Sequence, residues 1–168
     1  AGDCVLQPPH IRHRVLESSA GAQVVEIGCP ADHDTFFDYG LDLPTNTVDR
    51  DRDFGGQAFV RHQAALVSWG PSIHPGFEVQ HTEIEQATKG LASVRVLRSS
   101  GETTTTPTRH DGKLWFLFVL EGSARFAVEG PTNAASLTIG DSVAVPAGVT
   151  WGLHDASPSL RLLEVVVP

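Results

Sequence analysis

An internal repeat is the feature that most constrains how this chain can fold. Residues 2–8, Gly-Asp-Cys-Val-Leu-Gln-Pro, return 138 positions later at residues 140–146 as Gly-Asp-Ser-Val-Ala-Val-Pro. The same register pairs Val24–Ile27 with Leu162–Val165 and needs no gap. One short match arises easily by chance, but a second match in the same register does not. The repeat therefore predicts two copies of one structural unit.

The repeat also predicts the domain organisation. Each copy has the pattern of a strand after a Gly-Asp turn, a proline turn and a closing apolar strand. We expect residues 1–30 to be the C-terminal remnant of a first module and residues 58–168 to be a complete second module. Residues 31–57 are rich in aspartate and contain Gly55-Gly56, so they are predicted to connect the two.

Short apolar segments separated by Gly, Pro, Ser and Thr fill the second module. Such a succession is typical of an antiparallel sandwich or barrel, so the fold class is predicted to be all-β. Only Thr82–Lys89 has a helical composition. The predicted strands are Ala58–Arg61, Ala64–Trp69, Leu91–Leu97, Leu114–Leu120, Ala124–Val128, Ser142–Val145 and Leu160–Val167.

Net charge and composition limit the classes of partner that this chain is expected to bind. The net charge is −8 and the 12 Lys and Arg residues are scattered, which argues against nucleic-acid binding. The apolar runs are far shorter than the roughly 20 residues needed to cross a bilayer, so no membrane partner is expected. Two cysteines, Cys4 and Cys29, are too few for a disulfide framework and favour reduced thiols in a cytoplasmic protein. A disulfide between them is the alternative if their strands are neighbours.

Two parts of the second module resemble the two motifs of the cupin superfamily. The first motif, G-x5-H-x-H-x3-4-E-x6-G, fits at His110 and Gly122, and the second, G-x5-P-x-G-x2-H-x3-N, fits at Gly140, Pro146 and Gly148. The resemblance implies a double-stranded β-helix, or jelly-roll barrel, preceded by a short partial cupin sheet. The whole chain then resembles a two-barrel cupin, or bicupin, that lacks the first half of its N-terminal barrel.

The same resemblance implies where a divalent transition metal would bind. Cupins hold their metal with two histidines from one strand, a carboxylate or amide from the next, and a third histidine from the second motif. In this chain those positions are Thr108, His110, Trp115 and Trp151. Only His110 can bind a metal, and one imidazole does not hold an ion against water. The metal site is therefore expected to be degenerate.

The cupin register turns Trp115 and Trp151 toward the barrel interior. The two indoles either form the walls of an apolar pocket or plug the barrel, and both alternatives stay open. His110 is either a remnant metal ligand or acid–base group, or a hydrogen-bonded side chain that lines the barrel. The expected ligand-binding residues are Thr108, His110, Trp115, Leu117, Trp151, Leu153 and His154.

Other polar residues give weaker signals. Arg95 and Arg98 lie on one predicted strand, where alternation lets only one of them face inward, and surface exposure is the commoner outcome. His62, His74 and His81 lack the spacing of metal ligands and are expected in loops or on the surface.

Two classes of function follow. In the first, the barrel binds a small molecule or serves as a non-catalytic lobe. In the second, which the resemblance to bicupins implies, the chain is part of a metal-dependent dioxygenase or isomerase. The apolar side chains of residues 1–30 need cover. These residues are therefore expected to join a sheet of the second module, within the chain or across a homodimer.

Overall fold

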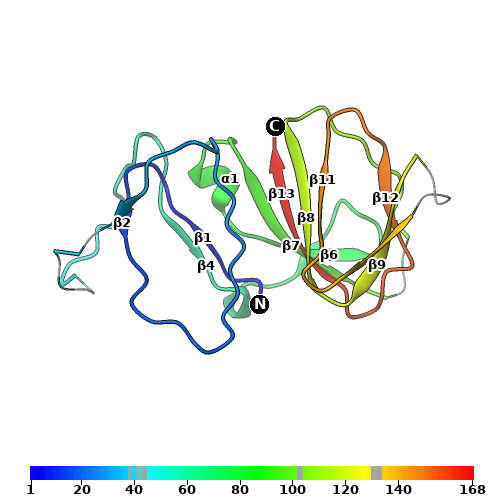
Figure 1. Cartoon of the computed structure of the whole chain (residues 1–168), viewed down its shortest axis with the longest axis horizontal. Helices are drawn as coiled ribbons and strands as arrows, with labels where there is room; N and C mark the ends of the chain where they lie inside the picture. Colours follow the sequence, from blue (N-terminus) through cyan, green and yellow to red (C-terminus); the bar gives the residue numbers. More distant parts are fainter. Residues whose placement is uncertain (38, 41, 43–44, 102–103, 130–133) are drawn as a thin grey trace. The chain divides into compact units, whose positions relative to one another are not determined.

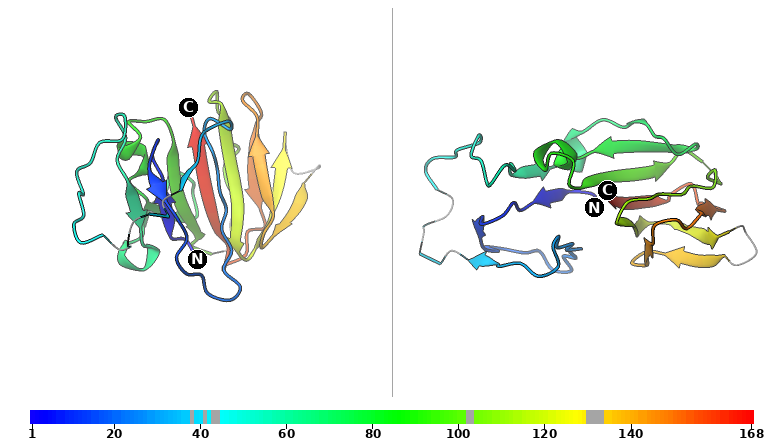
Figure 2. Two further views of the ribbon diagram at one scale, coloured as in Figure 1. Left: turned by 60° about the vertical axis from the view of Figure 1, so that its left-hand side comes forward. Right: turned by 90° about the horizontal axis from the view of Figure 1, so that it is seen from above.

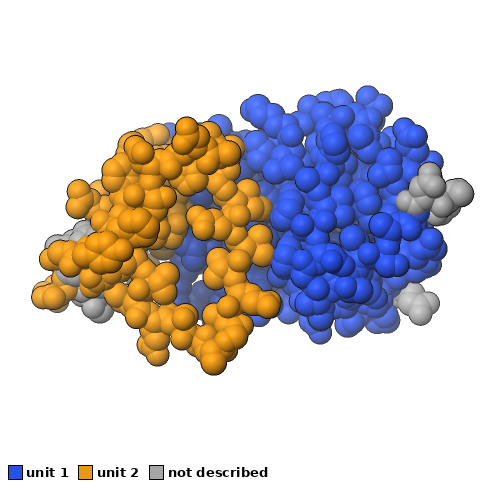
Figure 3. Space-filling model, in the orientation of Figure 1, with its two compact units in different colours: residues 1–6, 60–168 blue, residues 7–59 orange. Residues whose placement is uncertain are grey.

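The computed structural model describes residues 1–37, 39–40, 42, 45–101, 104–129 and 134–168. Positions 38, 41, 43 and 44 of the predicted connecting segment lie outside the described residues. The chain divides into two compact units: unit 1 comprises residues 1–6 and 60–168, and unit 2 comprises residues 7–59 (Figure 3). These units differ from the divisions 1–30, 31–57 and 58–168 that the repeat predicts, because the first strand of the chain pairs inside unit 1.

Unit 1 is built almost entirely of antiparallel strands (Figure 1). Within the described residues, one sheet has the order β11 (Ser142–Val145), β8 (Leu114–Glu121), β13 (Arg161–Val167), β7 (Ser93–Ser99), β6 (Phe77–His81) and β5 (Gly70–Pro71). A second has the order β10 (Ala135–Thr138), β9 (Ser123–Val128) and β12 (Trp151–His154). A third pairs β1 (Cys4–Leu6) with β4 (Val60–His62). The predicted all-β fold class is confirmed.

The first two sheets enclose the core. In Figure 1 and in the left view of Figure 2, strands β7, β13, β8 and β11 lie side by side in this order, and strands of the second sheet follow them. The buried cluster draws on both sheets, with Leu97, Leu117 and Leu162 from the first and Phe126 and Leu153 from the second. Side chains alternate along β8 between buried and half-buried, as a strand with one face on a core requires.

Several elements differ from the sequence prediction. Helix α1 (Ile84–Ala87) lies inside the helical segment predicted at Thr82–Lys89. The prediction of a strand over Ala64–Trp69 is wrong. A 3₁₀ turn occupies Ala64–Leu66 instead. Strands β6, β10 and β12 are not among the predicted strands, since they are short and two of them are interrupted by polar residues. No helix in the described part of the chain is long and apolar enough to cross a membrane.

Tertiary contacts explain the turn at Ala64. The Asp3 carboxylate accepts a hydrogen bond from the Ala64 backbone N–H (2.9 Å), and the Gln80 amide donates to the Ala64 carbonyl oxygen (2.9 Å). Gly2 has a φ of +102°, and a β-carbon there would lie 3.3 Å from the Ala64 side chain. A glycine thus lets the chain start close to this turn. Residues 1–6 join the second module in this way, whereas Arg12–His13 of the predicted remnant pairs with Phe36–Phe37 of the connecting segment, so the prediction made for residues 1–30 holds only for their first strand.

Unit 2 contains little regular structure. Strand β2 (Arg12–His13) runs parallel to β3 (Phe36–Phe37). The closing strand expected at residues 24–27 does not form, because the described residues supply no strand beside it, whereas its counterpart β13 is paired on both edges. Val15 and Val24 are 82% and 88% exposed in the single chain, and the homodimer stays a prediction.

The two cysteines are free thiols in the structure, so the bridge between them is not formed. Cys4 is half-buried on β1, and burial, with a smaller effect of the neighbouring Asp3 carboxylate, raises its pKa to about 11. Cys29 is exposed. The two thiols therefore differ in access and, for Cys4, in the fraction present as the reactive thiolate.

We expect iodoacetamide at pH 8 to modify Cys29 well before Cys4. Burial and the adjacent negative charge both disfavour the Cys4 thiolate, so at pH 8 almost all of this thiol is protonated. Mass spectrometry of tryptic peptides at timed intervals measures the two rates. The variant Asp3→Asn removes the negative charge and should speed labelling of Cys4 slightly. Equal rates at the two cysteines in the folded protein would contradict the position assigned to residues 1–6.

Candidate functional site

A fully buried carboxylate marks the centre of the barrel. Glu164 lies on β13 with 0% of its surface exposed, on the same face as Leu162. Its direct cross-strand partners are Arg95 on β7 and Leu117 on β8. Because Leu117 and Leu162 belong to the core, the register of the three central strands places a charged group inside an apolar barrel.

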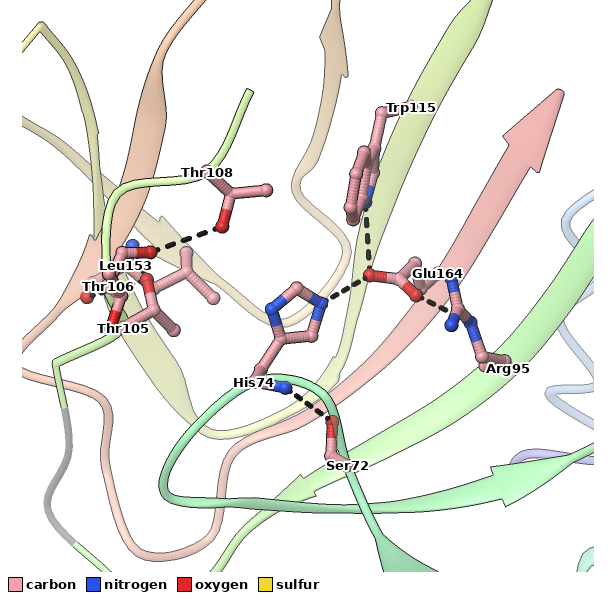
Figure 4. Close-up of polar contacts among 9 residues, drawn as sticks. All are labelled: Ser72, His74, Arg95, Thr105, Thr106, Thr108, Trp115, Leu153 and Glu164. Carbon is pink, nitrogen blue, oxygen red and sulfur yellow. Dashed lines mark hydrogen bonds and ion pairs between the residues drawn. The ribbon is translucent and has the colours of Figure 1, made fainter. Parts of the chain in front are cut away.

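Three side chains from different elements surround this carboxylate (Figure 4). The Trp115 indole N–H donates to Oε2 of Glu164 at 3.0 Å, and His74 donates from Nε2 to the same oxygen at 3.0 Å. The Nε atom of Arg95 lies 2.8 Å from Oε1, an ion pair without hydrogen-bond alignment. A buried carboxylate is destabilising unless it is paired and hydrogen-bonded, and here each oxygen has a partner.

His74 comes from the loop between β5 and β6. The hydroxyl of Ser72 accepts the backbone N–H of His74 at 3.0 Å, which fixes the loop where the ring enters the barrel. Since a carboxylate accepts only, Nε2 of His74 carries the proton. The predicted loop position is confirmed for His74, but the predicted surface position is wrong for this residue. His74 is 5% exposed, and His62 on β4 (Val60–His62) is equally buried.

The two arginines of β7 lie on opposite faces of the sheet. Arg95 is the one that faces inward, where it pairs with the protein's own carboxylate. Arg98 lies on the outer face and pairs with Glu78 at 2.7 Å. The prediction that only one of the two points inward is confirmed, and strand alternation is the reason.

Both predicted indoles point into the barrel near His110. Trp115 is 7% and Trp151 is 2% exposed, and their rings meet edge to face with centroids 5.3 Å apart. Phe126 stacks on Trp151 at 5.7 Å, and the His110 ring lies 5.6 Å from Trp115. These aromatic contacts fill the space between the two sheets, which is how small barrels commonly complete their cores.

His110 is held in one tautomer. Its Nε2 lies 2.8 Å from the carbonyl oxygen of Val145, so this nitrogen donates and carries the proton. Within the described part of the chain, its Nδ1 is buried without a hydrogen-bond partner, and the same holds for the indole nitrogen of Trp151. One buried acceptor or donor that is left unpaired is unfavourable by about 1–3 kcal/mol.

The other expected ligand-binding residues divide into two groups. Leu117 and Leu153 are buried in the core cluster with the indoles. Thr108 is half-buried, pairs its backbone with Trp151 and bonds its hydroxyl to the Thr106 carbonyl oxygen. His154 lies on the face of β12 opposite to Trp151 and Leu153, beside Gly152, so the structure does not bring it together with the indoles.

The donors present do not fit a transition metal. Among the residues that the structure describes, no three His, Cys, Asp or Glu side chains are grouped so that they could hold an ion. His74 and Glu164 bind each other, and His110 donates to a backbone carbonyl. Trp115, which aligns with the carboxylate of the cupin motif, offers an N–H instead of a lone pair. The centre is a hydrogen-bonded cluster.

The sequence contained a signal for Glu164 that motif reasoning missed. It is an acidic residue inside the closing strand Leu-Leu-Glu-Val-Val-Val, in phase with a buried leucine, and Glu26 occupies the same place in the first copy. A carboxylate in an apolar strand predicts a buried partner of opposite charge. No comparable signal marks His74, since its position depends on a loop.

Comparison with known proteins shows the fold. No protein-family model matches the sequence, and no curated protein matches it either. Among solved structures, KdgF from Halomonas sp. is similar with a TM-score of 0.53 and 17% identity, covering 63% of this chain and 92% of that one. A predicted oxalate decarboxylase from Thermotoga maritima has a TM-score of 0.55 and 16% identity, covering 62% of this chain and 96% of that one.

The polyketide cyclase RemF from Streptomyces resistomycificus is also similar, with a TM-score of 0.53, 16% identity and coverage of 62% of this chain and 76% of that one. Identities this low carry information on architecture alone. The barrel of unit 1 thus has the cupin fold that the motifs predicted.

We expect the substitution Glu164→Ala to lower the free energy of unfolding by about 3–5 kcal/mol, because it leaves the Arg95 guanidinium buried without its carboxylate. The matched control is Glu121→Ala on β8. Glu121 is 54% exposed and lies 3.9 Å from Arg161, so its removal should change stability by less than about 1 kcal/mol. Urea unfolding followed by circular dichroism measures both. Equal losses in the two variants would contradict the central role of Glu164.

Proposed function

We propose that unit 1 is a non-catalytic cupin domain that does not use a metal ion. The observation that carries this proposal is the Glu164 cluster, in which Trp115 donates its N–H to a protein carboxylate at the place where a cupin would bind its metal. A metal ligand must offer a lone pair, and an indole N–H has none to offer. The cluster therefore serves to hold strands together.

The packing of the interior supports the same proposal. Trp151 contacts both Trp115 and Phe126 in the barrel interior, and none of these three residues lines the pocket beside Trp69 or the pocket beside His62. A reaction needs space for a substrate beside its catalytic groups. The arrangement is that of a core, with the polar groups engaged mainly with each other.

One observation favours a second candidate function, which is binding of a small molecule inside the barrel. The Trp151 N–H is an unpaired donor and Nδ1 of His110 is an unpaired ring nitrogen, and both are buried. A hydroxyl group can accept a hydrogen bond from the Trp151 N–H or donate one to Nδ1 of His110. On this alternative the ligand is a small, neutral, hydroxyl-bearing molecule.

For the first proposal, we expect purified protein to contain well under one transition-metal ion per chain. The positions Thr108, Trp115 and Trp151 lack coordinating atoms of the kind that cupins use. Elemental mass spectrometry after dialysis measures the content, with His110→Ala as the matched variant. Equally low content in both supports the proposal. A stoichiometric metal in the wild type that disappears in His110→Ala would show that His110 anchors an ion.

For the second candidate, we expect phenol to shift the indole ¹H–¹⁵N signal of Trp151 in a saturable manner. Toluene, which has a similar shape but no hydroxyl, should bind at least about fivefold more weakly, because it leaves both nitrogen atoms unpaired. Trp151→Phe identifies the signal. Absence of a saturable shift, or equal binding of phenol and toluene, would remove this candidate and leave the first proposal unaffected.

A further inference from the structure

A second polar site lies on the outer face of the six-stranded sheet, outside the barrel. A pocket of about 340 Å³ is lined there by Trp69, Gln80, Arg98, Arg161 and three alanine residues. Its volume falls within the range of small-molecule sites, roughly 300–1,000 Å³. None of these four side chains takes part in the Glu164 cluster, so the pocket is separate from the interior discussed above.

Two arginines converge on this pocket. Arg98 on β7 and Arg161 on β13 are direct cross-strand partners, so their side chains share one face of the sheet. The Arg98 guanidinium lies 4.4 Å from the centroid of the Trp69 ring and that of Arg161 lies 5.8 Å away. Like charges directly opposite each other are unfavourable, and the indole face offsets only part of the repulsion.

The flanking carboxylates determine how much negative charge the pocket can accept. Glu78 is the cross-strand partner of Arg98 and lies 2.7 Å from it. Glu121 is the partner of Arg161 but lies 3.9 Å from it, which is a weak contact. The four charges of this row, which crosses four strands, thus balance. Arg161 also donates from Nη2 to the carbonyl oxygen of Ala1 at 3.2 Å, and its Nε–H stays unpaired within the described residues. Such a row favours a monoanion over a dianion.

Two residues that line this pocket carry unpaired polar atoms. Gln80 is 1% exposed and its amide nitrogen donates to the carbonyl oxygens of Ala64 and Val67. In the described part of the chain, its Oε1 is buried without a donor, and Nε of Arg161 is buried without an acceptor. Buried polar atoms are normally paired, so each of these requires an explanation. A molecule that brings both an acceptor and a donor supplies one.

We propose that this pocket binds a small hydroxycarboxylate. The carboxylate lies between the guanidinium groups of Arg98 and Arg161, which suit its planar geometry. The hydroxyl donates its hydrogen to Oε1 of Gln80. The side chains of Ala64 and Ala65 accept the apolar part of the ligand. This site gives the domain a binding activity on the outside of the barrel, independent of whether the interior binds a metal or a molecule.

The test uses mandelate as the probe and the indole ¹H–¹⁵N signal of Trp69, identified as the signal missing in Trp69→Phe, as the readout. We expect a saturable shift at one mandelate per chain. Phenylacetate, which lacks only the hydroxyl, should bind at least about fivefold more weakly, because Gln80 then stays unpaired. Arg98→Gln and Arg161→Gln should each weaken binding at least about tenfold through loss of a charged hydrogen bond.

Arg125→Gln is the matched control. Arg125 lies on β9, is 47% exposed and contacts Asp155, so its substitution removes the same charge at a different place and should leave mandelate binding unchanged. Should Arg161→Gln fail to fold, Arg98→Gln decides the question, since the Arg98 side chain is 40% exposed.

Four outcomes would overturn the proposal. They are absence of a saturable shift, equal binding of phenylacetate and mandelate, equal weakening by Arg125→Gln, and displacement of mandelate by inorganic phosphate at the same concentration. The last would show a general anion site. None of these results depends on metal content, so failure of the hydroxycarboxylate proposal is distinguishable from failure of the proposed function.

Discussion

The barrel depends on one buried ion pair and the hydrogen bonds around it. Glu164 and Arg95 face each other across neighbouring strands, and Trp115 and His74 bind the remaining oxygen of the carboxylate. Through these contacts β7, β8, β13 and the loop before β6 share one charged group. A carboxylate in an apolar interior is strongly unfavourable alone, so any shift in strand register that separated it from its partners would be costly. We infer that the pair disfavours other registers of the sheet.

The same strands carry a different chemistry on each face. Arg95 and Glu164 point inward to the aromatic core, whereas Arg98 and Arg161 point outward to the Trp69 pocket. Positions three residues apart on a strand lie on opposite faces, so two short stretches of sequence supply charged groups to both faces of the sheet. The interior site is closed by its own aromatic side chains, and the outer one is open. A cupin fold by itself does not decide which of its surfaces is used.

The two copies of the repeat show how far a strand depends on its neighbours. Leu162–Val165 belongs to β13, with β7 on one edge and β8 on the other. Val24–Ile27 has a closely similar sequence and forms no strand. The apolar residues of a strand gain little unless adjacent strands take up its hydrogen bonds and a second layer covers its face. A similar sequence therefore gives different structures in unit 1 and unit 2.

The sequence by itself determined the class of fold, the inward direction of Trp115 and Trp151, and the lack of a metal-coordinating side chain at three of the four positions where cupins bind metal. These follow from the period of two along each strand and from the chemistry of single side chains, both of which are local. Tertiary structure alone decided that His74 meets Glu164, that Arg95 and not Arg98 faces inward, and that Ala64 begins a turn. Each of these depends on which strands become neighbours and where a loop is held. Such contacts join residues as far apart as His74 and Glu164, 90 positions along the chain, and no local pattern encodes them.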